Sequence, residues 1–393
     1  MKKITAVLAL LIIATIAFTA CAPAVEPAVE APVAAEVEAP AAAEEEAPAA
    51  AEEEAPAAVE SQENPVKACM VTDSAGIGDK SFNDGVWKGL EQAIEDFPSV
   101  EAQYIESKTA DDYAPNIQAC IDSEPDIVLC VGFLMAEDCE KAIKANPDLY
   151  FAGVDIGFAE SYPKFLGVDA KMDQSSFQAG YLAAGMTETG TVGTYTGYFG
   201  EVVHIFMDGF WMGVQKYNEV KGTDVKVLGY DPKDPEWKNA LATNDWVDVD
   251  KGRQVSESLM DNGADIILPV IGQVGTGTAA VMQERGYGYI FGVDQDWLET
   301  NPAQKDQILA SVLKNMYVPI YEMVKNLVET DTWIGGTYYV LQYTNAGTGI
   351  VFNEDVDIPA DLKAEVLAFE DEIKAGTLTT LSPEFLAEYP LRK

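Results

Sequence analysis

One pattern repeats along residues 64–393 of this 393-residue chain: a short apolar segment, a polar turn and then an amphipathic helix. Strands that alternate with helices at this spacing form parallel sheets covered by helices on both faces. Five strands are expected at 68–72, 102–106, 127–131, 150–154 and 165–168, and five more at 191–195, 226–230, 266–270, 289–293 and 308–312. Two runs of five strands predict an α/β fold with two doubly wound, parallel-sheet lobes.

The length of this region also favours two lobes. A chain from 64 to 393 is too long for one small core and suits two lobes of about 150 residues each. We expect lobe 1 to comprise 64–188 and 309–332, and lobe 2 to comprise 189–308 and 333–393. The chain would then cross between the lobes three times, which predicts a three-strand hinge.

The first expected helix shows how the pattern positions polar groups. Its apolar face recurs at helical spacing through Phe82, Val86 and Leu90. Ser81 with Asp84 three residues later predicts a capping box at its start. The preceding turn, 76–80, follows the carboxyl end of the first strand, and doubly wound sheets bind ligands at that edge.

Other polar, aromatic and glycine residues occupy the same position after other strands. They are Phe133, Asp155, Gly272, Asp294 and Lys314. Taken singly, an aspartate there is more often a helix cap or turn former, and a glycine usually marks a tight turn. Together, on facing edges of two lobes, these residues predict a ligand cleft.

The N-terminus has the form of a bacterial export signal. Lys2 and Lys3 precede an apolar run over 4–18, and Cys21 follows small residues. We therefore expect a signal peptide at 1–20 and lipidation of Cys21. A transmembrane anchor is the alternative, but the run is shorter than the roughly 20 residues that a spanning helix needs.

Residues 22–63 consist almost entirely of Ala, Pro, Glu and Val, with twelve Glu, no Lys or Arg and no aromatic residue. Such a segment cannot bury enough apolar surface to offset its ordering entropy, and its like charges repel one another. We expect 21–63 to be a disordered tether. The folded part would then be lipid-anchored at the cell membrane, facing the extracytoplasmic side.

Charge and histidine content exclude several functions. The net charge is −40, and removing Lys2, Lys3 and the twelve tether glutamates leaves −30 for the folded part. Nucleic acid and anionic lipid would repel so acidic a body. His204 is the only histidine, so multi-histidine metal sites are excluded and few nucleophile–base pairs can be built. We expect His204 on a helix surface.

Four cysteines follow Cys21: Cys69, Cys120, Cys130 and Cys139. None forms a CxxC pair, so a zinc site is disfavoured, and we expect neither metal nor cofactor. An even number in an exported protein favours disulfides. The three possible pairings stay open, as do free buried thiols.

Seven motifs occur in an order typical of one family: DKSFND at 79–84, VGFLMAED at 131–138, FAGVD at 151–155, FMDGFWMGV at 206–214, DNGADIILPVIG at 261–272, FGVD at 291–294 and SVLKN at 311–315. Over about 66–355 the chain resembles the basic membrane protein family of substrate-binding lipoproteins, whose best-known branch is the purine nucleoside receptors. The resemblance implies a type I periplasmic-binding fold that serves a nucleoside importer of the ATP-binding-cassette (ABC) class.

The resemblance also implies a set of ligand-binding residues. Residue by residue, these are Asp79, Asn83, Phe133, Asp155, Phe206, Gly272, Asp294 and Lys314. Aromatic rings can stack on a base, with Phe206 the first choice and Phe133 or Trp87 the second. The carboxylates can accept hydrogen bonds from amines and ribose hydroxyls, Asn83 can donate and accept, and Lys314 can donate. Phe206 could instead be plain core, and Lys314 could merely pair with Asp294.

Two positions depart from the family pattern. Gln273 follows Gly272 where a second glycine is common, and Ser175-Ser176 replace an acidic pair. Both concern the identity of the ligand more than the fold.

We expect a tethered binding protein for a purine nucleoside, acting as a monomer with an ABC permease in the membrane. An enzyme is disfavoured because the chain has no nucleophile elbow, no triad partner set and no phosphate-loop lysine. A receptor for a sugar or another small ligand, and a sensory receptor without transport, are the alternatives.

Overall fold

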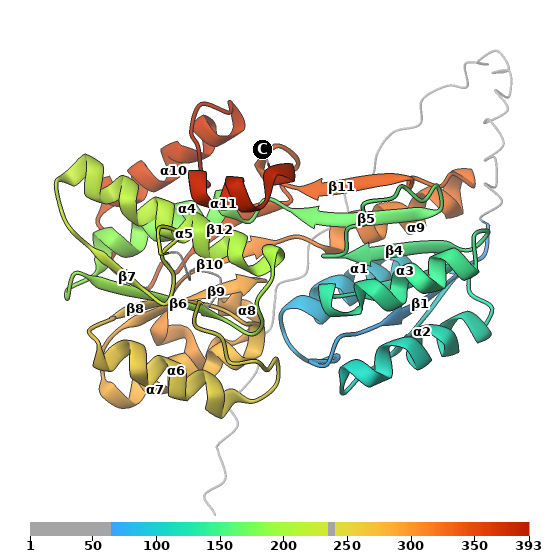
Figure 1. The fold of residues 1–393 in the computed structure, drawn as a ribbon, viewed down its shortest axis with the longest axis horizontal. Coiled ribbons are helices and arrows are strands. Elements are labelled where there is room, and N and C mark those ends of the chain that lie inside the picture. Colours follow the sequence, from blue (N-terminus) through green and yellow to red (C-terminus); the bar gives the residue numbers. More distant parts are fainter. Residues whose placement is uncertain (1–63, 235–239, 393) are drawn as a thin grey trace, which may run out of the picture. The chain divides into compact units, whose positions relative to one another are not determined.

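The computed structural model describes residues 64–234 and 240–392. The expected signal peptide, Cys21 and the tether lie outside these residues. The described part contains two six-stranded sheets, each with helices on both faces (Figure 1). The predicted pair of doubly wound α/β lobes is confirmed. Within the described part, no helix is both long and apolar enough to cross a bilayer.

The first sheet is entirely parallel and has the order β11-β5-β4-β3-β1-β2. Its strands are β1 (Val66–Val71), β2 (Val100–Ile105), β3 (Ile127–Val131), β4 (Tyr150–Val154), β5 (Phe165–Ala170) and β11 (Thr337–Leu341). Its main helices are α1 (Phe82–Asp96), α2 (Tyr113–Asp122), α3 (Ala136–Ala145) and α9 (Tyr317–Thr330). Helix α1 packs beside α9, and α2 packs beside α3.

The second sheet has the equivalent order β12-β10-β9-β8-β6-β7, with only β12 antiparallel to its neighbour. Its strands are β6 (Thr191–Thr196), β7 (Lys226–Leu228), β8 (Ile266–Val270), β9 (Tyr289–Asp294), β10 (Ile308–Lys314) and β12 (Thr348–Phe352). Its helices are α4 (Asp173–Met186), α5 (Glu201–Lys221), α6 (Val249–Asp261), α7 (Thr276–Arg285), α8 (Trp297–Thr300), α10 (Ala360–Lys374) and α11 (Pro383–Glu388). Short 3-10 turns occupy Ala110–Asp112, Phe133–Met135, Gly272–Gly275, Pro302–Gln307, Tyr343–Asn345 and Pro390–Arg392.

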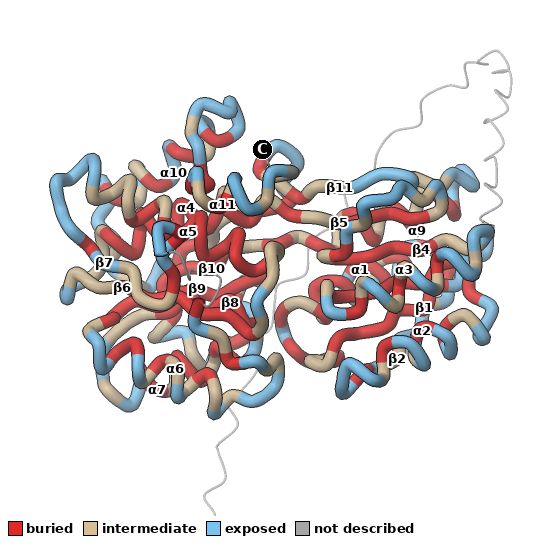
Figure 2. The backbone as a smooth tube through the Cα atoms, in the orientation of Figure 1, coloured by how far each residue is buried: buried red, intermediate tan, exposed pale blue. Residues whose placement is uncertain are grey.

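Strand β1 shows why the central strands are mostly apolar. Ala68 and Met70 join the core that contains α1 and α9, whereas Cys69 and Val71 join the core beneath α2 and α3. Successive side chains of a strand point to opposite faces, so a strand covered on both sides needs apolar residues at every position. Figure 2 shows the central strands mostly buried, whereas the edge strands β2, β7 and β11 and the solvent sides of the outer helices are partly exposed.

The structure settles the cysteine pairing. Cys69 of β1 and Cys120 of α2 form a disulfide, whereas Cys130 and Cys139 are free and buried. All four belong to the same core beneath α2 and α3.

Strand pairing places the chain crossings elsewhere than the expected boundaries at 188, 308 and 333. Helix α4 packs on α5, and β10 belongs to the second sheet, whereas β11 belongs to the first. The three crossings therefore lie after β5, after β10 and after β11. Strand periodicity locates a strand but says nothing of the sheet it joins, which explains the difference.

The capping box predicted at α1 does not form. The Ser81 side chain makes no bond to the helix start. Asp79 acts as the cap instead, because its carboxylate accepts hydrogen bonds from the backbone N–H groups of Ser81, Asn83 and Asp84 at 3.0, 2.8 and 3.1 Å. The Asp84 carboxylate accepts from Gly78 and Lys80 and so closes the preceding turn.

Candidate ligand-binding site

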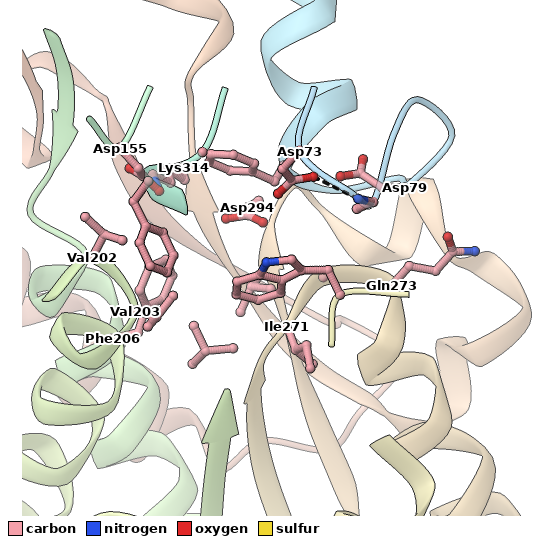
Figure 3. A pocket seen from close by; sticks show the side chains of 18 of the residues that line it. Asp73, Asp79, Asp155, Val202, Val203, Phe206, Ile271, Gln273, Asp294 and Lys314 are labelled. Atoms are coloured by element: carbon pink, nitrogen blue, oxygen red, sulfur yellow. Dashed lines mark hydrogen bonds and ion pairs between the residues drawn. The ribbon is translucent and has the colours of Figure 1, made fainter. Parts of the chain in front are cut away.

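A pocket lies between the two lobes, at the carboxyl ends of strands from both sheets (Figure 3). The space between its walls is about 690 Å³, a figure that includes space open to solvent. Its lining comprises Asp73, Ala75, Asp79, Phe82, Gly132, Phe133, Leu134, Asp155, Val202, Val203, Phe206, Trp246, Val270, Ile271, Gly272, Gln273, Val293, Asp294 and Lys314.

Seven of the eight residues expected in the site line this pocket: Asp79, Phe133, Asp155, Phe206, Gly272, Asp294 and Lys314. Asn83 lies behind them and is fully buried. They come together because parallel strands present their carboxyl ends at one edge of each sheet, and the two edges face one another.

The two lobes contribute matching turns. Gly132 after β3 and Gly272 after β8 both have positive φ, at 108° and 54°. Asp155 after β4 and Asp294 at the end of β9 also have positive φ, at 58° and 69°. Left-handed backbone is uncommon outside glycine, and such strain gathers at binding sites. Each aspartate is held in the pocket wall by this turn.

Lys314 is the only lysine or arginine that lines the pocket in the described part of the chain. Its Nζ lies 2.6 Å from both carboxylate oxygens of Asp155 and joins the end of β10 in the second lobe to the end of β4 in the first. The expected alternative partner, Asp294, is not its ion-pair partner. Burial raises the pKa of Asp155, and Lys314 opposes that rise.

A second group of acids surrounds the start of α1. The Asn83 amide donates to Asp73 at 2.8 Å and to Asp79 at 3.0 Å. Burial raises the pKa of Asp73 from its ordinary 3.8 to about 7, although the hydrogen bond from Asn83 acts in the opposite direction. Burial also raises the pKa of Asp79. Asp73 can therefore hold a proton near neutral pH.

Asp294 links the second lobe to this group. Its carboxylate accepts a 2.6 Å hydrogen bond from the hydroxyl of Ser81, and the amide of Gln295 donates to the Ser81 carbonyl at 2.9 Å. Burial raises the pKa of Asp294 to about 6, against the lowering effect of Lys314. Ser81 therefore serves as an interlobe contact and not as a helix cap.

Apolar and aromatic side chains form the rest of the wall; of these, Val203, Phe206 and Ile271 lie below the acids in Figure 3. The Lys314 ammonium lies 5.0 Å from the ring centroid of Phe82 and 5.9 Å from that of Phe206. Phe133 of the first lobe meets Trp246 of the second edge-to-face, with centroids 6.5 Å apart. The pocket thus combines aromatic faces with carboxylates.

Three of the charged and aromatic lining residues were not expected in the site from the sequence: Asp73, Phe82 and Trp246. Asp73 lies two residues after the end of β1, and a position just after a strand is the same signal that identified Asp155 and Asp294. Phe82 was assigned to the core face of α1 by its spacing, yet it lies in the first turn and reaches the pocket. Trp246 lies in a loop without periodicity, so only the tertiary structure reveals it.

Two expectations were wrong. His204 is 2% exposed, not on a helix surface, because α5 packs on the sheet and on Tyr230. Burial lowers the pKa of His204 to about 4. Trp87, an alternative stacking ring, does not line the pocket and meets Tyr104 edge-to-face, with ring centroids 5.0 Å apart. Within the described residues, no group of three or more His, Cys, Asp or Glu side chains could hold a metal ion.

Two doubly wound lobes with a pocket between facing sheet edges define a solute-binding protein with the type I periplasmic-binding fold. Residues 66–378 match the family described as ABC transporter substrate-binding protein PnrA-like, and the chain belongs to that family. The resemblance seen in the motifs is confirmed.

Individual proteins that are similar to this chain are consistent with the family assignment. Basic membrane protein A1 of Borrelia garinii subsp. bavariensis is 26% identical over 303 residues, or 76% of this chain and 83% of the relative. The CD4+ T-cell-stimulating antigen of Listeria monocytogenes is 26% identical over 325 residues, or 79% and 86%. The solute-binding protein of an ABC transporter system from Aeropyrum pernix K1 has the same fold, with a TM-score of 0.71, 22% identity and coverage of 80% and 93%.

Proposed function

We propose that this protein binds a purine nucleoside in the interlobe pocket and delivers it to an ABC permease. The observation that carries the proposal is the pairing of aromatic rings with carboxylates, contributed by both lobes to one pocket. A flat base requires the former, and hydroxyls and exocyclic amines require the latter.

The base would lie between Phe82 and Phe206. Both rings lie within 6 Å of one ammonium group, that of Lys314, so they border the same part of the pocket. Phe133 and Trp246 would close the space beside them.

The polar groups divide into two sets in this proposal. Asp155, Asp294 and Lys314 would bind the ribose hydroxyls, since two acceptors and one donor suit a diol. Asp73 and Asp79 would accept from the base. Asn83 would act through these two acids, because its amide already donates to both.

A sugar receptor is the main competitor, because carboxylates also suit sugar hydroxyls. The fold is shared with a periplasmic ribose ABC transporter protein from Conexibacter woesei, at a TM-score of 0.51 and 13% identity. A sugar alone would leave the rings of the pocket wall without a flat partner. We also propose that the protein performs no chemistry on its ligand.

Isothermal titration calorimetry with the full chain tests the ligand. Inosine, guanosine and adenosine should bind more tightly than free ribose or glucose. Ribose or glucose binding without any nucleoside heat would overturn the proposal. Prolonged incubation followed by chromatography should return the nucleoside unchanged.

We further propose that Cys21 carries a lipid and that 21–63 tethers the folded part to the extracytoplasmic face of the membrane. In the producing bacterium, Cys21→Ala should move the protein from the detergent phase to the aqueous phase of a detergent partition. Equal partition of both forms would contradict a lipid anchor.

A further inference from the structure

We propose that Arg392 is a positioning residue, which ties the two lobes together behind the pocket and holds the pocket wall formed by α5. The proposal builds on ligand binding in the cleft and adds a part of the chain that the family match does not cover, since that match ends at residue 378.

Arg392 contacts both lobes. Its Nη1 donates to the two carboxylate oxygens of Asp169 at 2.8 and 2.7 Å and to the carbonyl of Ala170 at 3.3 Å. Its Nε donates to Glu201 at 2.6 Å. Asp169 belongs to β5 in the first sheet, and Glu201 is the first residue of α5 on the second. One guanidinium therefore bridges the lobes.

Both contacts lie next to the pocket. Val202 and Val203, which line it, directly follow Glu201, and Phe206 lies one turn further along α5. Asp169 precedes the first crossing between the lobes. A rotation of the lobes that moved Asp169 away from Glu201 would take one of the two carboxylates out of reach of the guanidinium.

The segment that carries Arg392 is fastened to the second lobe. The Ser382 backbone N–H and hydroxyl both donate to the buried Asp208 of α5 at 2.6 Å, and the Thr380 hydroxyl donates to Asp173 of α4. Phe385 of α11 is fully buried. This C-terminal segment, in dark red in Figure 1, thus holds Arg392 against β5 from a fixed base.

The burial and geometry of the Arg392 ion pairs suit a restraint on lobe movement. The Arg392 side chain is 11% exposed, so water screens its ion pairs less than those on the surface. The planar guanidinium group donates hydrogen bonds in fixed directions in addition to its charge, and the ammonium group of lysine cannot reproduce that geometry. The bridge should favour the closed arrangement in the unliganded protein and slow the release of ligand.

The test compares full-length wild type with Arg392→Gln and Arg392→Lys. Spin labels on Lys141→Cys in α3 and Lys226→Cys in β7 report the distance between the lobes by electron double resonance. Without ligand, Arg392→Gln should shift the distribution to longer distances, and Arg392→Lys should shift it less. Arg285→Gln is the matched control, because Arg285 pairs with Asp261 within the second lobe alone.

Binding supplies the second readout. With guanosine or inosine, Arg392→Gln should raise the dissociation constant about 5- to 30-fold, about 1–2 kcal/mol at 1.4 kcal/mol per decade. The loss should appear mainly in the dissociation rate. It should also be non-additive with Glu201→Gln, because both changes remove the same bond.

The outcomes separate this proposal from the proposed ligand. If wild type binds no nucleoside, the ligand assignment fails, while the label distance without ligand still tests the bridge. An unchanged distance distribution in Arg392→Gln would overturn the bridge. So would an Arg285→Gln variant that opens the lobes equally, because that would indicate general loosening.

Discussion

Phe206 belongs to two environments at once: it lines the pocket and is also part of the core, with 3% of its surface exposed. Phe210, one turn further along α5, is fully buried and meets Phe291 edge-to-face at 6.1 Å. Both residues are phenylalanines on the same helix, but only Phe206 lines the pocket. They form a matched pair for separating ligand binding from core packing.

Phe206→Ala should weaken nucleoside binding more than it weakens the fold. A stacking partner contributes about 1–3 kcal/mol per base, or roughly a 5- to 150-fold change in dissociation constant. Phe210→Ala should instead lower the unfolding free energy by about 3–5 kcal/mol, because removal of a fully buried ring leaves a cavity in the core. Calorimetry and urea unfolding measure the two effects. Equal loss of stability in both variants with normal affinity would assign Phe206 to the core alone.

Asp73 should make stability depend on pH. Its pKa is about 7 in the folded protein against 3.8 ordinarily, so its contribution is fully present below pH 4 and is lost as pH rises to about 7. At about 1.4 kcal/mol per pKa unit, the loss is at most about 4 kcal/mol. We compare the unfolding free energy of Asp73→Asn with that of wild type at two pH values. The difference in favour of the variant should be larger at pH 8 than at pH 4.5. Urea unfolding that gave the same difference at both pH values would contradict this.

At the scale of elements, strand β1 and helix α2 are joined covalently through Cys69 and Cys120. The remaining two cysteines lie in the same core, so composition and spacing alone could not choose the pair. The choice depends on which helix packs over which strand.

Loss of this disulfide should destabilise the first lobe. It closes a loop with a sequence separation of 51, for which loop-closure entropy predicts about 4 kcal/mol. Urea unfolding of wild type should shift to lower urea when the disulfide is reduced with dithiothreitol. The variant with both Cys69→Ala and Cys120→Ala should start lower and not respond to reductant. A wild type that unfolds identically with and without reductant would argue against a structural role.

At the scale of the whole molecule, the most prominent feature is the large negative net charge. The folded part carries −30 and the tether adds twelve more negative charges. Self-repulsion of this size destabilises a compact state, and dissolved salt screens it.

Sodium chloride should therefore raise the melting temperature. Between about 0.05 and 0.5 M the Debye length falls by roughly threefold, so repulsion between exposed carboxylates weakens. Differential scanning fluorimetry in NaCl and in KCl should show similar increases, since screening depends on ionic strength. A fall in melting temperature with both salts would mean that screened ion pairs, such as that of Arg253 with Glu284, outweigh the repulsion.

The sequence by itself determined ten of the twelve described strands, their alternation with helices and most of the pocket's polar residues, but it did not reveal β11 and β12. Apolar periodicity is local, and parallel strands bring residues such as Asp155 and Asp294 to one edge. Only the tertiary structure decided which sheet β11 joins, that Lys314 pairs with Asp155, that Trp246 reaches the pocket and that Arg392 bridges the lobes. Each of these contacts joins residues far apart in the chain, and their proximity follows from the packing of whole elements, which no local pattern encodes.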